Sequence, residues 1–418
     1  MTEQTLERPA ATPRAAATPP THADLIAAAA ALVPPLALGA RQRDATRELP
    51  QSGIDAVRHA GITAARVPRA FGGAEAPYRV LVQAFVSLAR GDSNVAQALI
   101  PHFTAIERIR LMGSDAQRRR YFAAALAGDV FAGGTSERGG KFRTDITTQL
   151  TPDGDGFRLN GIKFYSTGSL MANQLRVTAL NPTGDRVSVV LPRERAGITL
   201  HDDWSGVGQR TTASGTSRYD NVRVEADEVI PFGPWEATQR NYGSSGAQLL
   251  HATIAAGIAL AALDDAVRWA RDGARPVKES GVQRSVDDPY VQHAIGHLSA
   301  HAHAAEATLL RAAEQVDAAA DAWHARPALT GGEEIQALCA RAAVAVAEAR
   351  IVTHEIGLKA GELLFEVGGA SATLEEHGFD RHWRNARTHT THDPVSYKFK
   401  VVGDYLLNGT PPPLSLYY

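Results

Sequence analysis

Cysteine is almost absent from this chain, since Cys339 is the only one among 418 residues. A single thiol excludes a disulfide within the chain, and it also excludes any zinc or iron–sulfur site built from several cysteines. The chain also has no large surplus of positive or negative charge. The formal net charge is -2, so no basic surplus indicates nucleic acid or an anionic membrane as a partner.

Long hydrophobic runs are also missing. The longest apolar segment, residues 25–40, is short for a membrane span and is interrupted by Pro34 and Pro35. The N-terminus has no apolar segment typical of a signal peptide, and residues 1–21 read as a disordered leader rich in Ala, Pro and Thr. We therefore expect a cytoplasmic protein that does not contact a membrane.

The remaining sequence predicts an α+β chain of three domains. Apolar residues spaced three and four apart predict helices over residues 22–128. Short alternating runs separated by Gly-rich turns predict an antiparallel β-domain over residues 129–234. Long helical patterns return over residues 235–418 and predict a four-helix bundle. No glycine fingerprint follows a strand, so no Rossmann site for a nicotinamide cofactor is expected.

Residues 380–398 concentrate polar chemistry in what we interpret as a short connection between two helices. His389 and His392 lie there with several arginines. Asp393 followed by Pro394 is typical of an N-cap and first helical position, which would place His392 at the mouth of the last helix. An imidazole at that point can have its proton affinity tuned by the helix dipole. The alternative is that His392 only packs against the cap.

Three segments carry a family resemblance. Residues 161–168 (GIKFYSTG) resemble the flavin-contacting strand of acyl-CoA dehydrogenases, residues 135–140 (TSERGG) resemble a variant of their Thr-Glu-Pro segment, and residues 204–216 lie where their second sheet segment lies. The resemblance covers the chain from about residue 22. It is closer to one branch, the reduced-flavin-dependent monooxygenases related to dibenzothiophene monooxygenase and to sulfur-acquisition oxidoreductases.

The resemblance implies an acyl-CoA dehydrogenase-like fold and a two-component monooxygenase. Reduced FMN, with FAD as a possible substitute, would come from a separate NAD(P)H-dependent flavin reductase. With O2 it would form a C4a-hydroperoxyflavin that oxygenates a small organosulfur substrate. Alanine-rich faces of the long C-terminal helices, together with the family's pairing of such bundles, predict a homotetramer.

The resemblance also implies roles for particular residues. The catalytic candidates are His392, Ser166 and His102. The flavin-binding candidates are Tyr165, Ser166, Thr167, Trp204, Arg387 and Arg275, the last reaching a flavin phosphate in a neighbouring subunit. The substrate-pocket candidates are Phe103, Phe164, Met171 and His251.

Departures from the dehydrogenase pattern leave alternatives open. Where a dehydrogenase carries a catalytic Glu followed by Gly, this chain has Asp393 and Pro394, and an Asp occupied as a cap is a poor base. Acyl-CoA oxidation is the first alternative, with oxygenation of nitrogen or carbon beside it. A non-catalytic flavin-binding module is the alternative of another class. His293, His297 and His301 recur at a spacing that could bind a metal, but no carboxylate motif accompanies them and we expect no metal.

Overall fold

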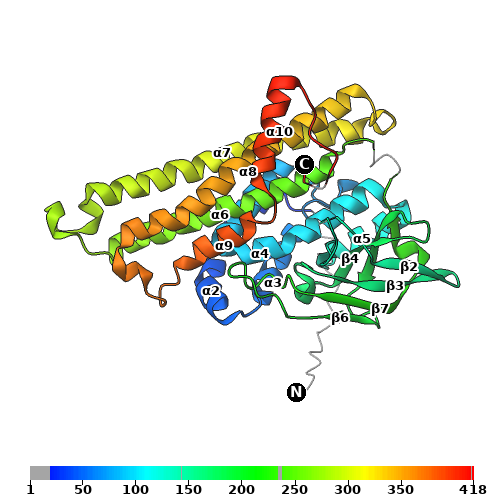
Figure 1. Cartoon of the computed structure of the whole chain (residues 1–418), viewed down its shortest axis with the longest axis horizontal. Helices are drawn as coiled ribbons and strands as arrows, with labels where there is room; N and C mark the ends of the chain where they lie inside the picture. Colours follow the sequence, from blue (N-terminus) through cyan, green and yellow to red (C-terminus); the bar gives the residue numbers. More distant parts are fainter. Residues whose placement is uncertain (1–18, 143, 234–237, 416) are drawn as a thin grey trace, which may run out of the picture.

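The computed structural model describes residues 19–142, 144–233, 238–415 and 417–418. Most of the predicted leader, and the predicted boundary between residues 234 and 235, lie outside these residues. A sheet occupies one side of the molecule, and a long helical bundle projects away from it (Figure 1). The helices before the sheet are α1 (His22–Ala31), α2 (Val33–Thr46), α3 (Gln51–His59), α4 (Tyr78–Met112) and α5 (Asp115–Leu126).

Helix α4 is interrupted at Asp92, whose backbone is extended with φ -152° and ψ 108°. The Asp92 carboxylate accepts a hydrogen bond from the Asn94 amide at 2.9 Å, as a helix cap does, and it pairs with Arg43 at 2.7 Å. The second half of α4 therefore begins as a new helix at the break. It places Ser93 and Asn94 against the β-domain.

The strands form one eight-stranded sheet in the order β6-β7-β3-β2-β4-β5-β8, with β1 paired to β4. Most pairs are antiparallel, but β4 runs parallel to both β1 and β2. A cluster of buried aliphatic side chains, Val177, Val189 and Val222 among them, forms the sheet's own core. The strands are β1 (Phe131–Gly134), β2 (Gln149–Asp153), β3 (Gly156–Lys163), β4 (Gln174–Leu180), β5 (Arg186–Pro192), β6 (Ile198–Leu200), β7 (Ser217–Val224) and β8 (Val229–Pro231).

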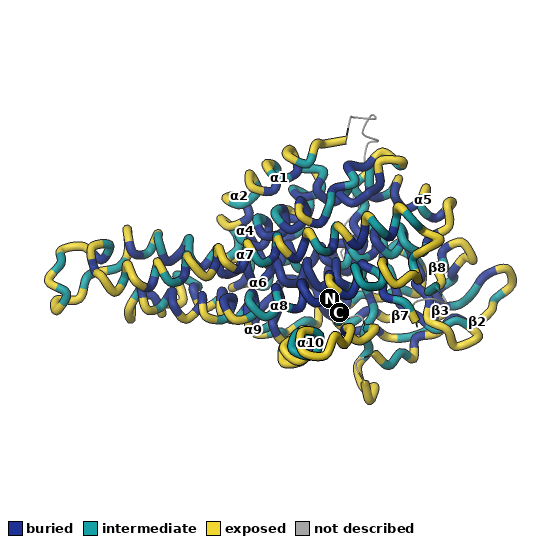
Figure 2. The backbone as a smooth tube through the Cα atoms, turned by 90° about the horizontal axis from the view of Figure 1, so that it is seen from above, coloured by how far each residue is buried: buried dark blue, intermediate teal, exposed yellow. Residues whose placement is uncertain are grey.

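The C-terminal helices pack around α6, which contacts α4, α7 and α8 extensively. The end of the bundle away from the sheet is narrow, and exposed positions alternate with partly buried ones along it (Figure 2). The order of helical domain, sheet and bundle confirms the predicted fold class. These helices are α6 (Tyr242–Asp272), α7 (Pro289–Ala325), α8 (Glu333–Gly368), α9 (Asp380–Thr390) and α10 (Val395–Asn408).

Helix α6 is the one described helix that is by itself long and apolar enough to cross a membrane, while α1 and α2 pass that test only when joined across a 42° bend. The most apolar window of α6 is 78% buried inside the protein. Since a core helix of a soluble protein has this character too, the apolar face is accounted for by packing inside the fold.

Two interpretations of residues 380–398 were wrong. Most of the supposed connection is itself the helix α9, so Arg384, Arg387 and His389 lie on a helix, and only residues 391–394 connect it to α10. Asp393 is not a cap, because Pro394 holds the N-cap position and α10 has no side-chain cap. The Asp393 carboxylate is turned to other partners, described below.

Candidate active site

A loop that follows β6, residues 204–216, is fastened to α9. The Gly208 amide donates to Thr388 Oγ1 at 2.9 Å, and the Gln209 amide donates to Asn385 Oδ1 at 2.6 Å. The Arg384 guanidinium completes the clamp by donating to the Val207 carbonyl at 2.9 Å. These bonds fix the position of the β-domain loop relative to the last turns of α9.

The same loop is also bound to the break in α4. Gln209 Nε2 donates to Ser93 Oγ at 3.1 Å, and the Thr211 amide donates to Asn94 Oδ1 at 3.2 Å. Gln209 adopts a left-handed backbone with φ 48°, an uncommon conformation for a residue with a side chain. The buried atoms Gln209 Oε1 and Thr211 Oγ1 have no hydrogen-bond partner among the described residues. Such orphaned atoms next to a loop held on two sides indicate a site for a polar ligand.

An aromatic surface lies at the start of this loop. Phe164 packs edge-on against Tyr165, with ring centroids 4.7 Å apart, and Trp204 lies 6.0 Å from Tyr165. The Trp204 indole donates to the Gln209 carbonyl at 2.7 Å, which fixes its orientation. Tyr165 is 55% exposed and has a left-handed backbone with φ 60°. An exposed ring held in an unusual backbone conformation is typical of a ligand contact.

Residues 135–138 form the neighbouring edge of this surface. Glu137 accepts a bond from the buried Lys163 ammonium at 2.7 Å and from the hydroxyls of Thr147 and Thr148. These bonds and the Lys163 charge hold the pKa of Glu137 at about 2, against the opposing effect of burial. The Arg138 guanidinium lies 3.2 Å from the centroid of the Phe164 ring. The segment is therefore locked to β3 beside the aromatic surface.

Ser166 lies beneath this surface, 1% exposed, with its Oγ 2.7 Å from Ser217 Oγ. Tyr219 donates its hydroxyl to Ser217 Oγ at 3.1 Å. Each hydroxyl donates one hydrogen bond and can accept two. When the Ser217 hydroxyl donates to Ser166, the Ser166 hydroxyl can donate its own hydrogen bond to a further acceptor. Thr167 bonds the Ser214 hydroxyl at 2.8 Å, which ties this turn to the 204–216 loop.

A cluster of histidines lies at the same, C-terminal end of α9 as the clamp. We call the region between this cluster and the aromatic surface of Phe164, Tyr165 and Trp204 the crevice. The imidazoles of His251 and His392 stack with centroids 4.2 Å apart, and His389 lies 5.7 Å from His251. The side chain of His392 is 44% exposed, whereas His251 and His389 are buried. Burial and the surrounding positive charge put the pKa of both His251 and His389 well below the usual value, so both rings are neutral at neutral pH.

The Asp393 carboxylate underlies this cluster and is only 1% exposed. His392 Nδ1 lies 2.7 Å from Asp393 Oδ1, while Arg350 and Lys398 approach Oδ2 at 3.4 Å and 3.7 Å. Burial alone would raise the pKa of Asp393, but the His392 bond and the Arg350 charge outweigh it and hold the pKa far below the usual range. Burial also lowers the pKa of Lys398 to about 8.

Several predicted site residues lie elsewhere. His102 is fully buried, its Nδ1 accepts a bond from the Phe131 amide at 3.2 Å, and its Nε2 lies 2.7 Å from the Thr63 carbonyl. Both ring nitrogens are therefore occupied by the backbone, and burial lowers the pKa of His102 to about 4. Phe103 and Met171 are 1% and 2% exposed and belong to the main hydrophobic core. The structure thus does not bring these three residues to the crevice surface.

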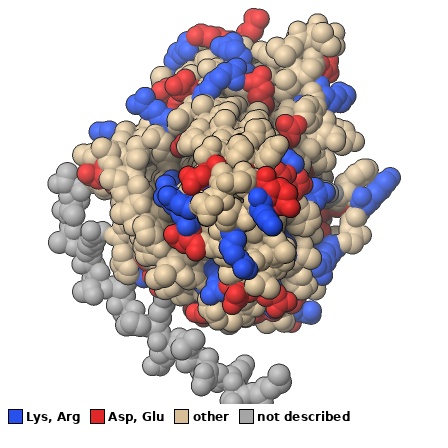
Figure 3. Space-filling model, turned by 90° about the vertical axis from the view of Figure 1, so that its left-hand side faces the viewer, with Lys and Arg blue, Asp and Glu red and all other residues tan. Residues whose placement is uncertain are grey.

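The two arginines among the predicted flavin-binding residues are separated. Arg387 is exposed on α9 beside the crevice, while Arg275 lies in the connection between α6 and α7. That connection is at the end of the bundle opposite the sheet (Figure 1). Acidic and basic side chains are interspersed on this end of the molecule, without a large patch of one sign (Figure 3). Among the described residues, no group of three or more metal-ligating side chains is arranged to hold a metal ion.

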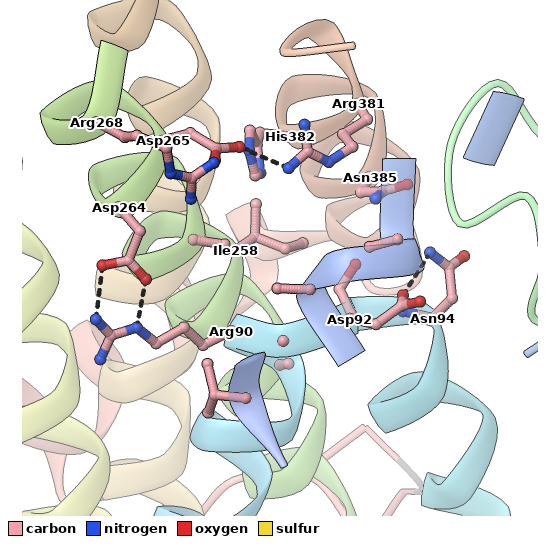
Figure 4. Close-up of a pocket in the computed structure, with 17 residues that line it drawn as sticks. Arg90, Asp92, Asn94, Ile258, Asp264, Asp265, Arg268, Arg381, His382 and Asn385 are labelled. Atoms are coloured by element: carbon pink, nitrogen blue, oxygen red, sulfur yellow. Dashed lines mark hydrogen bonds and ion pairs between the residues drawn. The ribbon is translucent and has the colours of Figure 1, made fainter. Parts of the chain in front are cut away.

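A small charged cavity of about 60 Å³ lies where α2, the break in α4, α6 and α9 meet (Figure 4). Asp265 on α6 accepts bonds from Arg381 at 2.6 Å and from His382 at 2.7 Å, both from the first turn of α9. Arg90 forms two bonds of 2.6 Å to Asp264. The Asp265 contacts anchor the start of α9 and the Arg90 pair joins α4 to α6, while the loop clamp fixes the end of α9.

Sequence reasoning missed the residues that position the site. Asn385, Thr388 and Gln209 gave no signal, because they are ordinary polar side chains whose partners lie about 180 residues away in the chain. Arg350 gave a weak signal: it is one charged residue in an otherwise apolar stretch of helix, and a buried charge requires a partner.

Comparisons with known proteins agree with this architecture. The model of the acyl-CoA dehydrogenase N-terminal domain matches residues 22–129, and that of the acyl-CoA dehydrogenase C-terminal domain matches residues 249–397. A dibenzothiophene monooxygenase from Mycolicibacterium goodii is 32% identical over 366 residues, which cover 84% of this chain and 86% of that protein. A probable FMNH2-dependent monooxygenase, SfnC, from Pseudomonas putida is 32% identical over 404 residues, 96% of this chain and 98% of that protein.

Among solved structures, FMN-bound TdsC from Paenibacillus sp. A11-2 superposes with a TM-score of 0.85. It is 28% identical in sequence, and the match covers 94% of this chain and 100% of that one.

Proposed function

Since this chain belongs to the acyl-CoA dehydrogenase family and groups there with FMNH2-dependent monooxygenases, we propose that it oxygenates a small organosulfur compound with O2. Reduced FMN is the cofactor, and a separate flavin reductase supplies it. SfnC is named as FMNH2-dependent and the TdsC structure is FMN-bound, and both the fold and the length of the match support carrying this cofactor over.

One observation favours this function over acyl-CoA oxidation: the carboxylate at the position of the dehydrogenase base is already engaged. Asp393 is 1% exposed and is bonded to His392, with Arg350 and Lys398 beside it. A carboxylate with a strongly lowered pKa and no exposed oxygen is a poor base for removing a substrate proton. The group that reaches the crevice surface here is an imidazole.

The residues around the crevice fit a flavin. Tyr165 and Trp204 offer aromatic surface beside the predicted position of the ring system, and Thr167 adds a hydroxyl. Gln209 Oε1 and Thr211 Oγ1 are orphaned in the adjoining loop, so polar groups at this place lack partners in the protein itself. Bound reduced FMN would supply the electrons that activate O2.

The chain's own residues then have distinct tasks. His392 is half exposed at the crevice, and we assign it the hydrogen bond or proton that O2 chemistry requires. Ser166, held by Ser217 and Tyr219, is assigned a hydroxyl for the flavin from its buried position beneath the aromatic surface. His251 is a neutral ring packed against His392, so it adds surface without adding charge.

The proposed substrate is small and neutral. Trp204 gives the crevice an aromatic wall, the buried rings of Phe164 and His251 pack against Trp204 and His392, and Phe103 and Met171 belong to the main core. Such a wall suits a sulfide, sulfoxide or thiophene better than a CoA thioester, whose phosphates require a basic cluster.

We further propose a cytoplasmic homotetramer. Exposed apolar side chains gather on and after α10, where Tyr397, Phe399, Leu406, Leu407 and Leu414 are each 46% to 84% exposed. An apolar surface of this kind is typical of a contact between subunits. Arg275 lies at the far end of its own bundle, so the role proposed for it requires the flavin site of another subunit.

The test of the function is a product assay with ¹⁸O2. The protein is mixed with FMN, NADH and a flavin reductase, and it receives a sulfide, a sulfone, dibenzothiophene, indole or an acyl-CoA. We expect ¹⁸O on the sulfur of the sulfide and of dibenzothiophene by mass spectrometry, and none on the sulfur of the sulfone, which has no lone pair left to oxygenate. Label only in indole would exclude sulfur as the target, and a desaturated acyl-CoA would exclude a monooxygenase. If hydrogen peroxide is the only product, and it forms as fast as when O2 oxidises reduced flavin without the protein, the result would support a non-catalytic flavin-binding module.

A further inference from the structure

The contact between His392 and Asp393 has consequences for how the imidazole is held. Nδ1 of His392 lies 2.7 Å from Asp393 Oδ1, a normal length for a charge-assisted hydrogen bond. An ionised carboxylate can only accept hydrogen bonds, so the proton in this contact belongs to Nδ1. In the neutral ring, Nε2 is then the nitrogen without a proton.

We infer that Asp393 is a positioning residue, which holds the His392 ring in one orientation with its proton on Nδ1. Only the expected effect of Asp393 on product formation rests on the proposed function. The tautomer of His392 is a property of the protein without flavin.

The two carboxylate oxygens of Asp393 have different partners. Oδ1 faces His392, while Oδ2 faces the two cations, Arg350 at 3.4 Å and Lys398 at 3.7 Å. All three side chains around this carboxylate are therefore donors or cations. Both oxygens are needed, because an acceptor must face the imidazole on one side and the cations on the other.

Residues close to the C-terminus hold Lys398 in place. Its ammonium donates to the Tyr417 carbonyl and lies 4.3 Å from the centroid of the Tyr418 ring, and Lys398 is 2% exposed. Tyr418 in turn donates its hydroxyl to the Tyr397 carbonyl at 3.2 Å. The cation thus has little freedom to leave the carboxylate.

The other face of the His392 ring is covered by His251, at 4.2 Å and an interplanar angle of 28°. The His251 ring is buried, and the backbone carbonyl of His251 lies 2.7 Å from His389 Nε2. Asp393 therefore holds one edge of the imidazole and His251 covers one face of it.

Asp393→Asn tests the inference, because an amide has only one oxygen. With Arg350 and Lys398 unchanged, that oxygen turns toward the cations and the amide nitrogen faces Nδ1 of His392. Nδ1 must then accept, so the proton moves to Nε2. Lys398→Met removes one cation without removing an oxygen, and the proton is expected to stay on Nδ1. Asp404→Asn, on the exposed side of α10, is the matched control.

The first measurement is ¹⁵N NMR of flavin-free protein labelled in histidine, with the His392 signals assigned by their loss in His392→Gln. We expect the Nδ1-protonated tautomer in the wild type, in Lys398→Met and in Asp404→Asn, and the Nε2-protonated tautomer in Asp393→Asn. An Nε2-protonated ring in the wild type overturns the inference even if Asp393→Asn does not fold. The same tautomer in wild type and Asp393→Asn, or a switch in Lys398→Met, also overturns it.

The second measurement is coupling, as product formed per O2 consumed. Asp393→Asn is expected to bind FMN as the wild type does and to lose product roughly 10²-fold, in the range for a misplaced acid or base. Full coupling in Asp393→Asn would overturn a role in catalysis. If the wild type oxygenates no substrate, the proposed function fails, and the tautomer result still decides whether Asp393 positions the ring.

Discussion

The imidazoles of His251 and His392 stack at 4.2 Å, although one is buried in the bundle and the other is half exposed at the crevice. Two stacked rings do not both carry a charge easily, because like charges at this distance repel. Burial holds the pKa of the His251 ring well below the usual value, so that ring stays neutral. The stack therefore pairs the exposed ring of His392 with a neutral, buried partner.

Replacing His392 is expected to separate flavin chemistry from substrate oxygenation. In His392→Ala the fold and the FMN affinity remain, since the side chain lies at the surface, but product per O2 falls about 10²-fold and hydrogen peroxide rises. A peroxidase-coupled assay beside product quantification measures both. His303→Ala, on the exposed side of α7, should stay coupled. Unchanged coupling in His392→Ala would remove His392 from the catalytic set.

His102 is expected to make the protein sensitive to acid. Its pKa is about 4 in the folded state and 6.5 in the unfolded state, because the folded site buries the ring and Nδ1 accepts from the Phe131 amide. The unfolded chain therefore binds the proton first as pH falls. Stability present above pH 6.5 is lost between pH 6.5 and pH 4, by about 3 kcal/mol.

Urea unfolding of wild type and His102→Gln over that range measures this loss. The glutamine can donate and accept but does not titrate, so the difference in unfolding free energy between the two proteins should shrink as pH falls. A constant difference from pH 7 to pH 4 would show that His102 does not cause the acid sensitivity.

Arg275 is expected to act on flavin binding and not on the reaction. Arg275→Ala should weaken FMN binding about 10-fold or more, the usual effect of losing a charge-assisted hydrogen bond to a phosphate. Fluorescence titration measures the affinity, and Arg271→Ala, near the same end of α6, is the control. Equal affinities in Arg275→Ala and wild type would exclude Arg275 from the flavin site.

The exposed leucines of α10 are expected to lie in a subunit contact. Light scattering should give a tetramer for the wild type and a smaller species for Leu406→Lys combined with Leu407→Lys, because burying two ammonium groups is costly. Leu38→Lys changes an exposed leucine on α2 and should leave the tetramer intact. A wild-type monomer at micromolar concentration would contradict both this contact and the intersubunit role of Arg275.

The fold was predictable because its signals are local. Period and turn residues separated helices from strands, and the motif around residues 161–168 led to the family. The errors concern partners. The pair Asp393 and Pro394 has the local pattern of a cap, but Arg350, forty-three residues earlier in the chain, competes for the same carboxylate and is invisible to a local pattern.

The candidate site was predicted only in part for the same reason. His392 and Trp204 stay predicted site residues, whereas His102 resembled a site residue and is in fact bonded to the backbone on both sides. Whether a histidine is structural depends on atoms that only the folded chain brings near. Thr63 and Phe131, its two partners, lie 39 and 29 residues away.

The clamp between the 204–216 loop and α9 affects how the protein matures during synthesis. Gly208 and its partner Thr388 are separated by 180 residues. At about 5–20 residues per second, the ribosome needs roughly 10–40 s to synthesise the chain between them. During that time the β-domain can fold while its crevice has no second wall. The candidate site is thus completed only after nearly the whole chain has been translated.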